Sequence, residues 1–280
     1  MPASFERARE LVYRSGRVLE RRLFAWLHED GPTVGVVGAV LGYRNDDGGF
    51  GHGLEPDKLA PQSQPLDVQF ALRTLADVGA DASEIGPAAC VFLETLADER
   101  GFVPIVLPSV ADYPRADHWG EGKFPPATSP AIAIAGYLHE LSVEHPWAKR
   151  VTASCLEALE AETPSEAHQI HDALVFVERV PEAAHLAPRL AEALPKADWF
   201  RADPADEGYG LPPTKFPRDW FDDELYDAHL DRLESEQQDD GGWPIAWEPP
   251  GPASLAAWRA IVTMEAVQVL AANGRLGVSA

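Results

Sequence analysis

Two loops of the sequence are near copies of each other. One reads Gln237-Gln238-Asp239-Asp240-Gly241-Gly242-Trp243-Pro244, and the other reads Asn45-Asp46-Asp47-Gly48-Gly49-Phe50-Gly51. Each follows one amphipathic stretch and precedes another. The glycines allow the positive φ angles of a tight turn out of a helix, and the aromatic side chain can then cover the joint between two helices. Weaker echoes begin at Gly101-Phe102-Val103-Pro104 and Gly208-Tyr209-Gly210-Leu211-Pro212. The loops predict a chain of helical hairpins.

Helical periodicity recurs between these loops, whereas strand signals are scarce. Starts such as Ser129-Pro130 place a capping residue before a proline in the first turn, as helix N-termini favour. Long connections rich in glycine, proline and aromatic residues separate the periodic stretches, and such loops are usually functional. The predicted helices span residues 4–28, 33–44, 64–79, 83–98, 129–142, 146–161, 165–179, 182–193, 221–236 and 254–273.

No change of composition marks a domain boundary, so residues 1–280 are predicted to form a single all-α domain. Helical pairs that repeat at about 40–55 residues indicate either a solenoid or a closed ring.

Composition excludes several classes of partner. The formal net charge is −22, which argues against nucleic acid and anionic membranes, because both attract clustered lysine and arginine. No uninterrupted apolar run is long enough for an integral membrane segment, and the N-terminal sequence has no signal-peptide core. We therefore expect a cytoplasmic protein whose two cysteines, Cys90 and Cys155, are reduced core residues.

The segment Leu233-Glu234-Ser235-Glu236-Gln237-Gln238-Asp239-Asp240-Gly241-Gly242-Trp243 resembles the QW repeat of squalene-hopene cyclases and the related repeats of prenyltransferase β-subunits. The resemblance implies an α/α toroid of five to six helical hairpins, with inner and outer helices around a central cavity. It implies that the motif residues tie helices together rather than catalyse. The sequence departs from the family in two respects. It has no Asp-x-Asp-Asp acid motif, and neither cysteine has the Asp-x-Cys arrangement of a prenyltransferase zinc site.

The loop and helix start at 51–69 hold the first group of candidate site residues. Glu55 and Asp57 are predicted to form a carboxylate pair in which one raised pKa creates a general acid, with His52 to reprotonate it. Gln64 and Asp67, at the helix start, are predicted substrate contacts. The competing interpretation is a solvated acidic loop in which Asp67 favours the helix dipole.

A second group opens the helix predicted at 165–179. His168 and His171 are three residues apart and share a helix face with Asp172. His171 and Asp172 are candidate catalytic groups, and His168 is a candidate substrate contact. The spacing is compatible with a metal site, an acid–base pair or a supporting network, and equally with a capped helix start.

The remaining candidate contacts are aromatic residues together with Arg115. Arg115, His118 and Trp119 lie in a long loop that is predicted to form a lid or the rim of a cavity, with Arg115 placed to meet an anionic group. Trp247 and Trp258 are predicted to line the cavity. Packing of these rings within the loop and the core is the alternative.

The stretch Asp219-Trp220-Phe221-Asp222-Asp223-Glu224-Leu225-Tyr226-Asp227 superficially resembles the aspartate-rich Mg²⁺-diphosphate motif of class I terpene synthases. Mg²⁺ is the one cofactor that the sequence suggests, because it takes carboxylate and phosphate oxygens. The alternative is a helix N-terminus, which acidic residues suit.

These patterns lead to one expected function and two alternatives. The first is a terpenoid-cyclase-like lyase or isomerase that uses an acid to cyclise or rearrange an isoprenoid or another small apolar substrate. A carbohydrate-active (α/α) barrel enzyme would also use paired carboxylates and aromatic platforms. The second alternative is a non-catalytic binding protein that has the toroid fold but has lost the acid motif.

Overall fold

The computed structural model describes residues 3–277, and within that range the regular secondary structure is entirely helical. The α-helices are α1 (Phe5–Ser15), α2 (Val18–His28), α3 (Thr33–Leu41), α4 (Pro65–Asp77), α5 (Ile85–Glu94), α6 (Thr128–Glu140), α7 (Pro146–Ala161), α8 (Ala167–Arg179), α9 (Ala187–Ala193), α10 (Asp223–Ser235) and α11 (Pro252–Ala272). Short 3₁₀ helices are η1 (Pro108–Asp112), η2 (Asp117–Trp119), η3 (Pro181–Leu186), η4 (Leu194–Lys196), η5 (Pro213–Lys215) and η6 (Arg218–Trp220). The all-α prediction is confirmed.

Two predicted helices are divided in the structure. The predicted helix 4–28 is two helices, because Gly16 adopts an extended conformation and the backbone N–H of Arg17 donates to the Glu20 carboxylate at 2.8 Å. That contact caps the start of α2, and the prediction missed it. The predicted helix 182–193 is the 3₁₀ helix η3 followed by α9.

Contacts divide the chain into two compact units, and the division falls inside α3. We call Val40–Asp198 the central unit, and Met1–Ala39 with Trp199–Ala280 the terminal unit. The prediction of a single domain stays a prediction.

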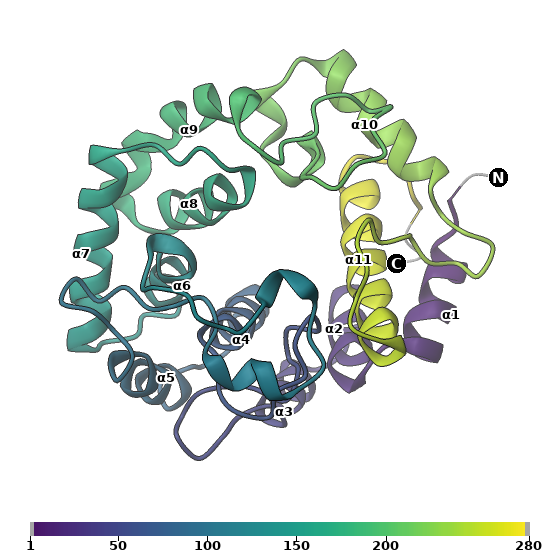
Figure 1. Cartoon of the computed structure of the whole chain (residues 1–280). Coiled ribbons are helices and arrows are strands. Elements are labelled where there is room, and N and C mark those ends of the chain that lie inside the picture. The colour runs from purple at the N-terminus through teal and green to yellow at the C-terminus, as the bar shows by residue number, and fades with distance from the viewer. Residues whose placement is uncertain (1–2, 278–280) are drawn as a thin grey trace. The chain divides into compact units, whose positions relative to one another are not determined.

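The central unit is built from two layers of helices. Helices α4, α6 and α8 pack side by side, whereas α5, α7 and the η3–α9 segment form the second layer (Figure 1). Small residues allow the closest of these contacts. A Cβ atom on Gly136 of α6 would lie 3.0 Å from the Val175 carbonyl oxygen of α8, so these two backbones approach as only glycine permits. Because the layers alternate along the chain, α4, α6 and α8 begin at the same end of the unit.

The repeated loops form the same turn in three places. In each turn, the N–H of the first residue donates to the carbonyl of the fifth residue. The fourth residue is a glycine with φ near +90°, and its N–H donates to the carbonyl of the first residue. The first residues are Asn45, Asp98 and Gln238, and the glycines are Gly48 (φ 88°), Gly101 (φ 91°) and Gly241 (φ 96°). A buried apolar residue follows each time: Phe50, Val103 and Trp243. The echo at Gly208 does not share this turn, because its backbone N–H instead donates to the Asp206 carboxylate.

Two of these turns set where the next helix begins. The carbonyl of Phe50 accepts the N–H of Gln64 at 2.8 Å, and the carbonyl of Val103 accepts the N–H of Ala127 at 3.2 Å. Gln64 and Ala127 are the residues that directly precede α4 and α6. These two turns therefore hold the starts of α4 and α6, two of the helix ends that carry the candidate site.

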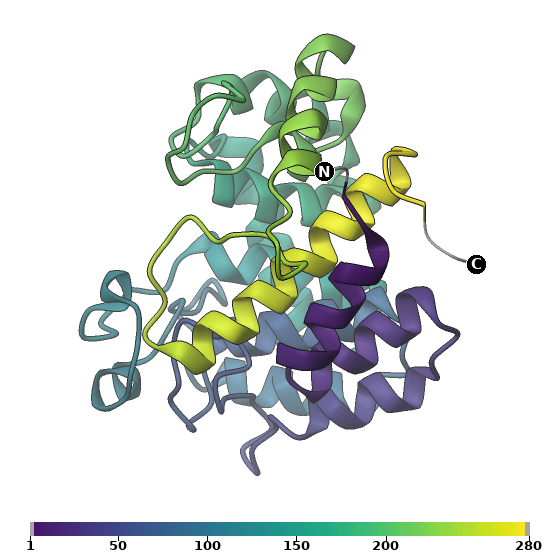
Figure 2. The same ribbon diagram turned by 90° about the vertical axis from the view of Figure 1, so that its right-hand side faces the viewer.

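The terminal unit packs α1, α2 and α10 against α11, and Figure 2 shows α1 (purple) alongside α11 (yellow). Its core is a cluster of buried side chains that includes Phe5, Phe24, Trp243 and Met264. Helix α11 is the one helix among the described residues whose length and apolar composition would allow it to cross a membrane, a test that core helices also pass.

Candidate functional site

The N-terminal ends of α4, α6 and α8 meet at the carboxyl group of Asp172. Asp172 Oδ1 accepts a hydrogen bond from Gln69 Nε2 of α4 at 3.1 Å, and Oδ2 accepts one from the Ser129 hydroxyl of α6 at 2.7 Å. Both donors are neutral. The two bonds hold the carboxyl in one orientation without neutralising its charge.

The protein around Asp172 makes its ionisation costly. Desolvation by the surrounding helices raises the pKa of this carboxyl to about 6, and the hydrogen bonds from Ser129 and Gln69 oppose that rise. No cationic side chain contributes to the shift. Asp172 nevertheless keeps part of its surface exposed to solvent. It is therefore a desolvated carboxyl group that is partly protonated near neutral pH, which a general acid requires.

Other polar groups lie on α4 and α8. The Oε1 atom of Gln69 is buried and has no hydrogen-bond partner among the described residues, so this amide oxygen still has an acceptor position to offer. His168 and His171 are half-buried on α8, and burial lowers the pKa of His168. The predicted grouping of these histidines with Asp172 stays a prediction.

A buried ionic cluster lies in the loop before α4 and in its first turn. The Nζ of Lys58 is 3.0 Å from Oε2 of Glu55 and 3.0 Å from Oδ1 of Asp67, and all three side chains are almost completely buried. The backbone N–H of Glu55 also donates to Asp67 Oδ1 at 2.7 Å. One ammonium group thus holds two carboxylates, and it fixes the loop to the helix.

Asp67 is the second carboxyl group with a strongly raised pKa. Complete burial raises this pKa to about 6, although the nearby Lys58 ammonium favours the ionised form. Its other oxygen, Oδ2, is buried and has no hydrogen-bond partner among the described residues. A protonated Asp67 would place its proton on that oxygen. Asp67 has no exposed surface on which to meet a substrate, whereas the residue Asp172 as a whole is half-buried.

Glu55 and Asp57, the predicted carboxylate pair, are both buried. The carboxylate that shares a cation with Glu55 is Asp67, and the backbone carbonyl of buried Asp57 accepts the N–H of Ala116 at 2.7 Å. His52 is exposed, and its Nε2 lies 2.9 Å from Asn45 Oδ1 in the first repeated turn. The catalytic roles predicted for these residues stay predictions.

The aromatic loop after Val103 is folded onto the α4 end of the unit. Residues 57–59 pair with residues 114–116 through backbone hydrogen bonds, and Trp119 is buried with Leu66 and Val110 in a small apolar cluster. His118 is exposed and lies against the Trp119 ring, with 4.5 Å between the two ring centroids.

Two predicted substrate contacts hold this loop in place. Arg115 donates to the backbone carbonyls of Ala111, Tyr113 and Gly120 in its own loop. Gln64 is completely buried; its amide donates to Ser109 Oγ at 2.8 Å and accepts the Leu107 N–H at 2.7 Å. The observed contacts give both side chains a positioning role.

Trp247 and Trp258 belong to the terminal unit. Their ring centroids are 5.1 Å apart in an edge-to-face arrangement, and the chain of aromatic contacts continues through Tyr209 to Trp199. Trp199 and Tyr209 are exposed.

Three of the four aspartates between residues 219 and 227 are occupied by local contacts. Asp222 caps α10 by accepting the N–H of Leu225, and Arg218 pairs with Asp223 and Asp227. Across residues 3–277, no group of three or more histidine, cysteine, aspartate or glutamate side chains is arranged to hold a metal ion. The suggestion of Mg²⁺ remains untested.

Three residues of the site were not among the candidates from the sequence: Lys58, Gln69 and Ser129. The spacing of Glu55 and Lys58 hints at an ion pair, and Ser129 stands at a recognisable helix start. Gln69 carries no such signal, because only the packing of α4 near α8 brings it to Asp172.

No known protein-family model matches the chain, and no curated protein matches it in sequence. The arrangement of the side chains is therefore the basis for proposing its chemistry.

Proposed function

We propose that the protein is a terpenoid-cyclase-like enzyme that uses the carboxyl group of Asp172 as a general acid on an isoprenoid or another small apolar substrate. The observation that carries the proposal is the state of this carboxyl. Desolvation raises its pKa to about 6, two neutral donors hold it, and the residue as a whole is only half-buried.

The protonation state of the Asp172 carboxyl group suits this role. With a pKa of about 6, roughly a tenth of the Asp172 carboxyl groups carry a proton at pH 7. Since no cation stabilises the carboxylate, no ion pair lowers this pKa and keeps the group ionised at neutral pH. Proton transfer to an alkene leaves a cation on the substrate, and the Asp172 carboxylate then lies close enough to stabilise that charge or to take a proton back.

The repeated turns support the fold that goes with this chemistry. Three turns share one hydrogen-bond pattern, and the central unit alternates strictly between two helix layers. These features support an α/α toroid with inner helices α4, α6 and α8. In such a fold, the helix ends that meet at Asp172 would face the substrate cavity.

A ligand screen tests the proposal. Purified protein is melted in the presence of prenyl diphosphates, neutral isoprenoids or simple sugars, each with Mg²⁺ and with EDTA. A ligand that binds the native state raises the melting temperature by mass action. The proposal predicts a shift with isoprenoid compounds and product formation that is lost in Asp172→Asn. Binding without any turnover, or turnover that survives Asp172→Asn, would contradict it.

The carbohydrate alternative has one observation in its favour. The exposed rings of Trp199 and Tyr209, which continue into Trp247 and Trp258, offer flat faces of the kind on which sugar rings stack. A melting-temperature shift with sugars and none with isoprenoids would favour this alternative over the cyclase.

A further inference from the structure

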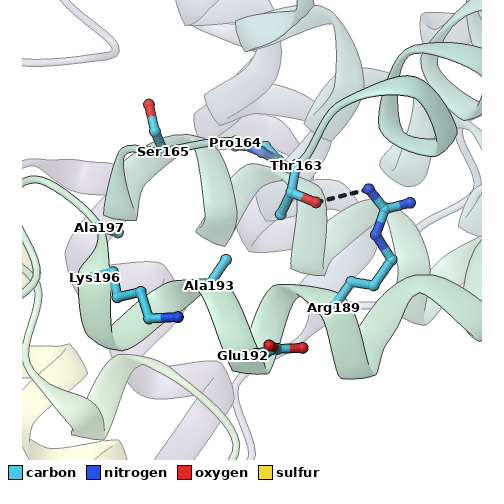
Figure 3. A pocket seen from close by; sticks show the side chains of 8 residues that line it. All are labelled: Thr163, Pro164, Ser165, Arg189, Glu192, Ala193, Lys196 and Ala197. Atoms are coloured by element: carbon cyan, nitrogen blue, oxygen red, sulfur yellow. Dashed lines mark hydrogen bonds between the residues drawn. The ribbon is translucent and has the colours of Figure 1, made fainter.

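One pocket of the central unit is lined by none of the groups described around Asp172. It has a volume of about 380 Å³ and is formed by the α7–α8 connection and the α9–η4 segment. Its lining residues are Thr163, Pro164, Ser165, Arg189, Glu192, Ala193, Lys196 and Ala197 (Figure 3). Two cations and two hydroxyl groups thus line one opening.

Lys196 is exceptional among the lysines of this acidic protein. The chain has five lysines, and four of them form ion pairs with carboxylates: Lys58, Lys123, Lys149 and Lys215. Lys196 has no such partner among the described residues. The chain has 45 aspartates and glutamates but only 23 lysines and arginines. A shortage of carboxylates therefore does not explain why the Lys196 ammonium is unpaired. Its position leaves it available to an external anion.

Arg189 is held in place by neutral groups only. It donates to the Glu160 carbonyl at 3.2 Å and to the Thr163 hydroxyl at 2.8 Å, and no carboxylate among the described residues neutralises it. These bonds fix the guanidinium before any ligand arrives, while its remaining N–H groups stay free to donate.

The α9–η4 segment places both cations, which are exposed, along the pocket. Arg189 and Ala193 lie in α9 and Lys196 lies in η4, and Figure 3 shows the small Ala193 side chain between the two cations. Across the opening lie Thr163 and Ser165, whose hydroxyls are hydrogen-bond donors. A fixed guanidinium, an ammonium and hydroxyls around one space suit a phosphate group, which has several acceptor oxygens and up to two negative charges.

We propose that this pocket binds the phosphate group of a small phosphorylated molecule. Lys196 and Arg189 supply the charge, and Thr163 and Ser165 add neutral donors. Glu192, which also lines the pocket, opposes the binding of an anion and keeps it weak enough to be reversible. The proposal does not depend on the chemistry of Asp172.

Phosphate binding tests this site directly. Inorganic phosphate and phenyl phosphate are titrated into the full-length protein and followed by calorimetry at low salt. We expect saturable binding that weakens as the salt concentration rises. Loss of a charge-assisted hydrogen bond typically costs about tenfold or more in affinity, so Lys196→Gln is expected to weaken binding by about that factor. Glu192→Gln is expected to strengthen it.

Lys149→Gln is the matched control, because Lys149 is exposed but already paired with Glu144. It is expected to bind phosphate as the wild type does. Absence of saturable binding, or equal effects of Lys196→Gln and Lys149→Gln, would overturn the site. Acetate that binds as tightly as phosphate would overturn the ligand class.

Discussion

The side-chain amide of Gln69 donates a 3.1 Å hydrogen bond to the carboxyl group of Asp172, although 103 residues separate them in the chain. The bond connects α4 with α8 at the end where both helices begin. Together with Ser129 of α6, it joins three helices of one layer through a single carboxyl group. A hydrophobic contact would have held these helix ends equally well. The polar arrangement instead keeps an ionisable group at a fixed place with a pKa near physiological pH.

Ser129→Ala is expected to raise the pKa of Asp172 above its present value of about 6. The Ser129 hydroxyl stabilises the ionised carboxylate, so its loss favours the protonated form. We expect a rise of about one pKa unit, since a hydrogen bond to a charged group contributes on the order of 1.5–3 kcal/mol, part of which water can replace. A ¹³C NMR titration of the aspartate carboxyl groups measures the change.

Ser109→Ala is the matched control for that titration, because its hydroxyl contacts Gln64 and not Asp172. It should leave the pKa of Asp172 unchanged. A fall of the Asp172 pKa in Ser129→Ala would contradict the prediction, because it would show that the hydroxyl stabilises the protonated carboxyl group instead.

Asp172→Asn is expected to stabilise the protein, and to do so only above about pH 4. The folded-state pKa of Asp172 is raised from 3.8 to about 6, so the native state binds more protons than the unfolded state between these values. The contribution of Asp172 to stability is therefore present below about pH 4 and is lost as the pH rises through about 6. A shift of about two units at roughly 1.36 kcal/mol per unit gives a gain of up to about 3 kcal/mol at pH 7.

Urea unfolding of the wild type and Asp172→Asn at pH 4, 5, 6 and 7 checks this sign. The difference in unfolding free energy should grow over the range and then level off. A difference that stays constant across these pH values would mean that the pKa of Asp172 is not raised in the folded protein.

Lys58→Met is expected to destabilise the protein by about 3–5 kcal/mol, the usual cost of removing one partner of a buried ion pair. The substitution leaves Glu55 and Asp67 buried together without their shared cation. Neutralising both carboxylates as well, in Glu55→Gln/Lys58→Met/Asp67→Asn, should recover much of the loss. Urea midpoints at pH 7 provide the measurement.

Lys149→Met serves as the control for Lys58→Met, because it breaks an exposed ion pair with Glu144, and we expect little change from it. If the triple variant were as unstable as Lys58→Met alone, the loss would come from packing around the lysine stem rather than from unpaired charge.

The sequence was a good guide to the helices because their signals are local. The predicted helix 146–161 coincides with α7, and proline starts and apolar periodicity identify most of the others. The prediction of one helix over 4–28 missed the break at Gly16 for a local reason too. The residues on both sides of Gly16 are periodic, so the capping contact between Arg17 and Glu20 is hidden within that pattern.

The candidate site was predictable only in part, because its contacts join distant segments. Spacing alone identified Asp172 with its histidines, and loop composition drew attention to residues 51–69. The pairing of Glu55 with Asp67 through Lys58 depends on how the loop folds back onto the first turn of α4, and the sequence suggested Asp57 instead. Likewise, the neutral donors of Asp172 come from two other helices whose packing no local pattern specifies.

Gly48→Ala and Gly241→Ala are expected to destabilise the protein by about 2 kcal/mol or more each. Both glycines have positive φ angles, which cost an alanine on the order of 1–2 kcal/mol. An added Cβ on Gly48 would also lie 2.5 Å from the Ala88 carbonyl oxygen, and one on Gly241 would clash with the Arg7 carbonyl. Gly101→Ala should cost less than the other two, because its nearest contact is the Val151 side chain at 3.2 Å.

Gly38→Ala is the matched control for these substitutions. Gly38 lies in α3 with no other atom within 4 Å of its added Cβ, so alanine there should stabilise the helix by about 0.5–1 kcal/mol. Urea unfolding of all four variants at one pH gives the ranking. If Gly48→Ala and Gly241→Ala behaved like Gly38→Ala, the repeated turns would not be what joins the helices of each hairpin, and the resemblance to the cyclase repeat would lose its structural basis.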